Sequence, residues 1–284
     1  MRPNSCWRRS AFFLVAIVAF TMPNTSAGQD WSAKDLRRLG RQAFDEGRYS
    51  DAQRELRRAL DEFGAGKNSV EIAQTLGDLA GVLAAQERYS EAEQLLDRAV
   101  AIIDMIPKGV GAYPRETSRL LGNLGALYEQ TGRHQAAEPA FKRALRLLQQ
   151  YKPDDPHIVV VLSNLGALHT QIGNYKQART DLRQALDFAG KWLPSDDPDL
   201  VPLLTNFAAL YQRQKKWALA ESYLLRAVQI AEHSLRPDHP DRGLVLEHLG
   251  VVHYRQGKLD QAEMELRGAL DLCGARLEWK ASGV

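Results

Sequence analysis

The chain has 284 residues, of which 44% are apolar and 25% are charged, a composition typical of soluble globular proteins. Its formal net charge is only +2, whereas a nucleic-acid-binding domain usually carries a strongly basic surface. These values argue against nucleic-acid binding, and the length allows one large domain or two ordinary ones.

The first 27 residues have the order of a secretory signal peptide. A basic start with three arginines precedes the apolar run 11–20, and small and polar residues follow at 24–27. The apolar run has ten residues, whereas a membrane-spanning helix needs about 20. We therefore expect cleavage after Ala27 and export to the periplasm or the extracellular space, in a bacterium as the form of the signal suggests. The alternative is an uncleaved anchor, which would be the chain's own attachment to a membrane.

The rest of the chain repeats a pattern six times, with spacings of 40 to 45 residues. Each copy has a small residue, a leucine four positions before it, and alanines 12 and 19 positions after it. The small residues are Gly40, Ala80, Gly125, Gly166, Ala208 and Gly250. Small residues on both sides of a contact let two helices approach closely. The pattern predicts two antiparallel helices in each copy.

In chain order, we expect the helix pairs at about 33–66, 73–106, 118–151, 159–192, 201–234 and 243–276, within a repeat domain 28–276 and before a short tail 277–284. A glycine turn joins the helices of most pairs, and Glu87 and Lys215 replace the glycine in the second and fifth copies. Helix-capping pairs are expected at the following positions: Ser32 with Asp35, Ser50 with Gln53, Ser90 with Glu93, and Asp260 with Glu263.

Proline-bounded linkers separate the last four copies, with the sequences PDDP at 153–156, SDDP at 195–198 and PDHP at 237–240. Proline ends the preceding helix, and an aspartate can cap the next one. With the Leu-x-Asn-Leu-Gly segment at 162–166, these linkers resemble the kinesin-light-chain type of tetratricopeptide repeat. The resemblance implies an all-α fold: a right-handed superhelical solenoid of six antiparallel helix pairs, whose first helices line a concave, peptide-binding face.

On that face, the position two residues before the small residue holds Asn123, Asn164 and Asn206 in the three central copies. An asparagine side chain both donates and accepts hydrogen bonds, so it can pair with a peptide backbone. Ser163 and Thr205 lie beside the asparagines and would let an extended segment come close. The alternative is that the asparagines are only polar lining.

Farther along the same helices, Gln130, Gln171, Arg213 and Arg255 would form the wall of the groove. The two arginines make its C-terminal end basic, so an acidic residue of a ligand could bind there. The alternative is that these are solvated helix charges.

We expect no enzyme activity, no metal site and no cofactor. His169 and His253 recur at a position that holds tyrosine in other copies, so we interpret them as packing residues. Trp217 belongs to a similar series, interpreted as core. Cys273, the one cysteine left after cleavage, is expected to be a small buried residue. The sequence shows neither an HExxH metal motif nor a phosphate loop.

The predicted function is that of an exported scaffold or adaptor that binds a protein or peptide in its concave groove. The alternative is a structural protein that assembles through its terminal repeats or its convex face, with a homo-oligomer as one form. The last repeat lacks an evident polar cap, so apolar surface should be exposed there.

Overall fold

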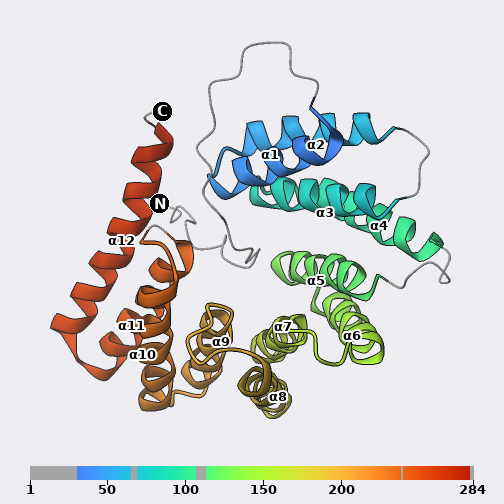
Figure 1. Cartoon of the computed structure of the whole chain (residues 1–284). Coiled ribbons are helices and arrows are strands. Elements are labelled where there is room, and N and C mark those ends of the chain that lie inside the picture. The colour runs from blue at the N-terminus through green and yellow to red at the C-terminus, as the bar shows by residue number, and fades with distance from the viewer. Residues whose placement is uncertain (1–30, 65–68, 107–112, 238, 282–284) are drawn as a thin grey trace. The chain divides into compact units, whose positions relative to one another are not determined.

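The computed structural model describes residues 31–64, 69–106, 113–237 and 239–281, with the backbone alone at residue 240 and from residue 273 onward. These residues form twelve α-helices and no strand, which confirms the predicted all-α repeat fold (Figure 1). The helices are α1 Ala33–Asp45, α2 Tyr49–Phe63, α3 Val70–Ala85, α4 Tyr89–Met105, α5 Pro114–Gln130, α6 His134–Tyr151, α7 His157–Gln171, α8 Tyr175–Trp192, α9 Leu200–Arg213, α10 Trp217–Ser234, α11 Pro240–Gln256 and α12 Leu259–Ala281.

The described residues belong to two compact units, one ending at Leu127 and the other beginning at Tyr128. In the first unit, α1 pairs with α2 and α3 with α4. In the second unit, the pairs are α7–α8, α9–α10 and α11–α12, and α6 packs against α7. Among the first helices of successive repeats, α7 contacts α9 and α9 contacts α11. The three helices therefore form one continuous face of the second unit.

In the first, fourth and sixth repeats the small residue has to be glycine, because a leucine of the second helix occupies the space beside it. A methyl group added at Gly40 would lie 2.6 Å from Leu56, and one added at Gly166 would lie 2.5 Å from Leu182. At Gly250 the corresponding distance, to Leu266, is 2.7 Å. Since real methyl groups do not approach this closely, a larger residue would push the two helices apart.

The alanines predicted to face these contacts are all buried. Their exposed fractions do not exceed 3% at the first position and 1% at the second. The residues are Ala52, Ala92, Ala137, Ala178, Ala220 and Ala262, followed by Ala59, Ala99, Ala144, Ala185, Ala227 and Ala269. The repeat alignment therefore predicted the core contacts correctly.

The turns between paired helices need a left-handed residue. Gly47, Gly132, Gly173 and Gly257 have φ between +73° and +80°. Glu87 and Lys215, which replace glycine at this position, keep the same turn with φ of +64° and +58°. A side chain in this region costs some stability, but the hydrogen bonds of the surrounding turn maintain its conformation.

The prediction of the first cap is confirmed, because the Ser32 side chain accepts a hydrogen bond from the Asp35 backbone N–H. The predicted caps at Ser50, Ser90 and Asp260 are wrong, since these helices begin one residue earlier. The turn explains the difference: the Arg48 N–H donates to Ala43 and closes α1, and the Arg48 carbonyl accepts the first bond of α2. One residue thus ends one helix and starts the next.

The linkers bond to the start of the following helices, but the predicted aspartate N-caps are wrong: the N-cap residues of α7 and α9, Pro156 and Asp199, make no side-chain cap bond, and the N-cap of α11 is His239. In each, the third linker residue accepts a hydrogen bond from the backbone N–H two residues later. The pairs are Asp155 with His157 (3.0 Å), Asp197 with Asp199 (2.9 Å) and His239 with Asp241 (3.2 Å).

The last repeat exposes apolar side chains, as expected: Leu259, Met264 and Leu270 are 58–67% exposed. Helix α12 continues to Ala281, so most of the expected tail at 277–284 is helical. Among the described helices, none has the length and apolar character needed to cross a membrane. The expected signal segment 1–27 lies outside the described residues, and so does the side chain of Cys273.

Replacing Ala178 with leucine tests the repeat contact, because the Ala178 carbonyl lies 3.4 Å from the position of a methyl group on Gly166. We expect a loss of about 1–3 kcal/mol of unfolding free energy from overpacking. Urea denaturation measures it, with Ala218→Leu on the exposed face of α10 as the matched control. Equal midpoints for the two variants would contradict this account of the core.

Candidate functional site

A groove of about 400 Å³ lies on the face formed by α7, α9 and α11, and α10 closes one side. This volume is near the lower end of the range seen for ligand pockets. The lining residues are Ala167, Thr170 and Gln171 of α7, Asn206, Ala209, Gln212 and Arg213 of α9, Trp217 of α10, and His248, Val251 and Arg255 of α11. Four of the predicted site residues, Gln171, Asn206, Arg213 and Arg255, therefore line one groove.

Asn206 links α9 to α7 across the floor of the groove. Its Nδ2 donates to the Ser163 hydroxyl at 2.9 Å and to the Ser163 carbonyl at 3.3 Å. Because both donors are used within the fold, the side-chain oxygen of Asn206 is the atom that remains for a ligand. Ser163 is buried and acts by holding Asn206 in place.

Gln171 makes a similar link from α7 to the end of α5. Its Nε2 donates to Glu129 Oε1 at 2.5 Å, and both residues belong to the second unit. Burial raises the pKa of the Glu129 carboxyl to about 7. The protonation state of Glu129, at the α5 end of this face, therefore changes with pH within the physiological range.

A third link joins α9 to α11. Gln212 Nε2 lies 3.5 Å from His248 Nδ1 and 3.4 Å from the His248 carbonyl. Burial lowers the pKa of His248, so its imidazole is neutral at pH 7. Amide side chains thus connect consecutive inner helices at three levels.

The remaining predicted residues are not among those that line the groove. Thr205 is buried, and its hydroxyl donates to the Val201 carbonyl at 2.8 Å. Asn164 and Gln130 are half-buried on α7 and α5. Asn123, in the first unit, has a buried side-chain nitrogen without a hydrogen-bond partner among the residues the structure covers.

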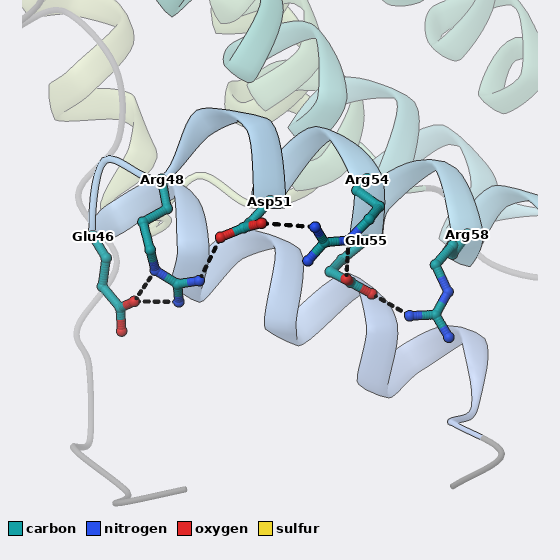
Figure 2. Close-up of polar contacts among 6 residues, drawn as sticks. All are labelled: Glu46, Arg48, Asp51, Arg54, Glu55 and Arg58. Carbon is teal, nitrogen blue, oxygen red and sulfur yellow. Dashed lines mark hydrogen bonds and ion pairs between the residues drawn. The ribbon is translucent and has the colours of Figure 1, made fainter. Parts of the chain in front are cut away.

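Arg213 and Arg255 are exposed, and neither forms an ion pair with any described residue. Figure 2 shows the opposite situation along α2, where three arginines alternate with three acidic residues. Arg48 pairs with Glu46 and Asp51, Arg54 with Asp51 and Glu55, and Arg58 with Glu55. These six charges along α2 neutralise one another, whereas the charges of Arg213 and Arg255 in the groove are not neutralised by a described residue.

In the second repeat, the position equivalent to the asparagines holds Asp78, which is buried between two arginines. Its carboxylate lies 2.7 Å from Arg37 Nε and 3.1 Å from Arg119 Nη1. Arg37 also donates to Gln74 at 2.6 Å. Here two ion pairs to one carboxylate join α1, α3 and α5.

His169 and His253 are buried, as predicted for packing residues, and each also lies between two carboxylates. His169 is 2.6 Å from Asp181 and 3.5 Å from Glu138. His253 is 2.8 Å from Glu265 and 3.0 Å from Glu221. The acidic partners come from the same repeat and the preceding one, so these clusters tie neighbouring repeats together.

Glu221 is the most strongly paired of these acids. Burial raises the pKa of its carboxyl, but hydrogen bonds from Lys258, Gln256 and His253 outweigh burial and bring the pKa to about 2. No group of three or more potential metal ligands has a suitable arrangement in the part of the chain described. The histidine clusters are structural links, because each histidine contacts acids of its own repeat and of the preceding repeat.

The interpretation of Trp217 as a core residue is incomplete, because its half-buried indole also lines the groove. His248 and Val251 line it as well. The last two stand at the same offsets as Asn206 and Ala209, so the repeat register could have identified them. Trp217 is the first residue of α10, a second helix, so counting positions along the inner helices could not identify it.

The comparisons with known proteins agree with this architecture. The tetratricopeptide repeat model matches residues 33–104, 116–191 and 199–274, which is more than half of the chain. The chain belongs to the tetratricopeptide repeat family. Proteins built from these repeats are suited to protein–protein interaction, and they are generally scaffolds rather than enzymes. A search of curated proteins found no similar sequence.

Solved structures share the fold at low sequence identity. BtubC (BKLC) from P. vanneervenii has a TM-score of 0.60 at 18% identity, over 82% of this chain and 91% of that chain. TPR-like repeats described as those of a kinesin light chain in Podosopora anserina have a TM-score of 0.54 at 19% identity, over 72% and 97%. A Rap protein complexed with Competence and Sporulation Factor has a TM-score of 0.69 at 15% identity, over 87% and 65%.

Glu129 provides a test of the electrostatics beside the groove. Its folded-state pKa of about 7 lies above the ordinary value of 4.5, so the wild type loses stability as the pH rises from about 4.5 to 7. Glu129→Gln removes that penalty and keeps an acceptor for Gln171. We expect the variant to be the more stable protein at pH 8, with the advantage vanishing near pH 4. Thermal melts of both proteins between pH 4 and pH 8 test this expectation. A difference in melting temperature that does not change with pH would refute the raised pKa of Glu129.

Proposed function

We propose that this protein is a scaffold or adaptor that binds an extended segment of a partner protein in the groove of α7, α9 and α11. The observation that supports the proposal is the groove itself: polar side chains stand over small residues, Ala167 and Ala209, which leave room for a backbone. Neighbouring inner helices are about 8–10 Å apart, a distance that about three residues of an extended partner segment would span.

The related fold of a Rap protein complexed with Competence and Sporulation Factor supports the proposal by analogy. Fixed amide groups also favour binding. Because Asn206, Gln171 and Gln212 are already held by neighbouring helices, a ligand would not have to order them.

Ala209→Phe tests the groove without touching the repeat contacts. The same register position holds Val251 in the last repeat and Arg41 in the first, so it accepts a large side chain. We expect at least about tenfold weaker binding of a native partner, since the added ring fills the path of the segment. The matched control is Ala101→Phe on the exposed surface of α4.

The experiment is affinity capture from the envelope fraction of the native host, followed by affinity measurement with each purified partner. Partners lost with Ala209→Phe and kept with Ala101→Phe would support the proposal. Partners kept by both variants would contradict it and move attention to other surfaces, such as the exposed apolar residues of α12.

We also propose export, on the basis of the signal-like order of residues 1–27. The mature chain would then begin at Gly28. N-terminal sequencing of the protein purified from its host tests this, and a chain that retains residues 1–27 in the cytoplasm would contradict export.

A further inference from the structure

The charge of the groove indicates what kind of segment it would accept. Its lining contains two arginines and no acidic side chain, and burial keeps His248 neutral. The arginines come from different helices, Arg213 from α9 and Arg255 from α11, yet they line the same groove. Neither is neutralised by a described residue, in contrast to Arg37, which pairs with a buried aspartate.

We propose that the groove selects a partner segment bearing an aspartate or glutamate side chain, which Arg213 and Arg255 receive. This inference rests on the proposed function and adds the chemistry of the ligand. A guanidinium group matches a carboxylate with two parallel hydrogen bonds, so two arginines provide donors for one or two acidic side chains.

The repeat register specifies where the acid lies. Both arginines stand five positions after the small residue, on neighbouring inner helices about 8–10 Å apart. A single acidic side chain can reach either guanidinium, and two acids would be about three residues apart in an extended segment. At the other end of the face, Glu129 would repel a carboxylate when it is ionised. The acid therefore belongs at the α9–α11 end.

Apolar groups complete the subsite. Trp217 and Val251 line the groove beside the arginines, and an indole face partly shields an ion pair from water. Such shielding strengthens charge pairing relative to a fully exposed helix surface.

The test uses a displayed library of random decapeptides and three proteins. These are the wild type, Arg213→Gln/Arg255→Gln, and the charge-matched control Arg146→Gln/Arg179→Gln, whose arginines are exposed on α6 and α8. We expect the wild type and the control to enrich peptides that contain aspartate or glutamate. A selected peptide should bind the groove variant about tenfold more weakly and lose affinity as salt is raised. Because both arginines are exposed, helix content by circular dichroism should be unchanged.

A charge reversal provides the second arm. Arg213→Glu/Arg255→Glu should enrich lysine and arginine in place of the acidic residues. Enriched peptides that lack acids, yet fail to bind Ala209→Phe, would overturn the charge inference and leave the proposed function standing. If no peptide binds the wild type, or binding is unaffected by Ala209→Phe, the groove itself fails as a peptide site.

Discussion

In the first, fourth and sixth repeats a leucine of the second helix packs against the backbone of a glycine in the first helix, and the other repeats keep a small residue at that position. Gly40, Gly166 and Gly250 have no room for a methyl group because Leu56, Leu182 and Leu266 occupy the space. Since the two helices touch on this side, the opposite side of each first helix is turned away from its partner. Stacking α7, α9 and α11 then joins those sides into one polar face.

The inner helices of the two units are held together by different kinds of contact. In the second unit, amide side chains bridge α5, α7, α9 and α11 by donating hydrogen bonds to the neighbouring inner helix. In the first unit, the equivalent position of the second repeat is Asp78, held by Arg37 and Arg119. A buried carboxylate between two guanidinium groups is a structural link, because breaking it would leave a buried charge unpaired.

The sequence predicted the fold because its signal, small residues at a regular period, reports contacts within one repeat. It also predicted that Asn206 and Gln171 share a face with Arg213 and Arg255. It could not show that both donors of Asn206 bind Ser163, because that bond depends on the packing of one repeat against the next. The carboxylates around His169 and His253 were missed for the same reason. The caps of α2 and α4 failed because a tight turn places Arg48 and Arg88 where a serine was expected.

The central claim is that the face of α7, α9 and α11 binds the partner. Site-specific photo-crosslinking in the native host tests it most directly, with a benzophenone amino acid placed at residue 209 or at residue 101. The account predicts a covalent adduct to one partner polypeptide from residue 209 and none from residue 101. Adducts from residue 101 alone, with residue 209 silent, would show that the protein binds through another surface.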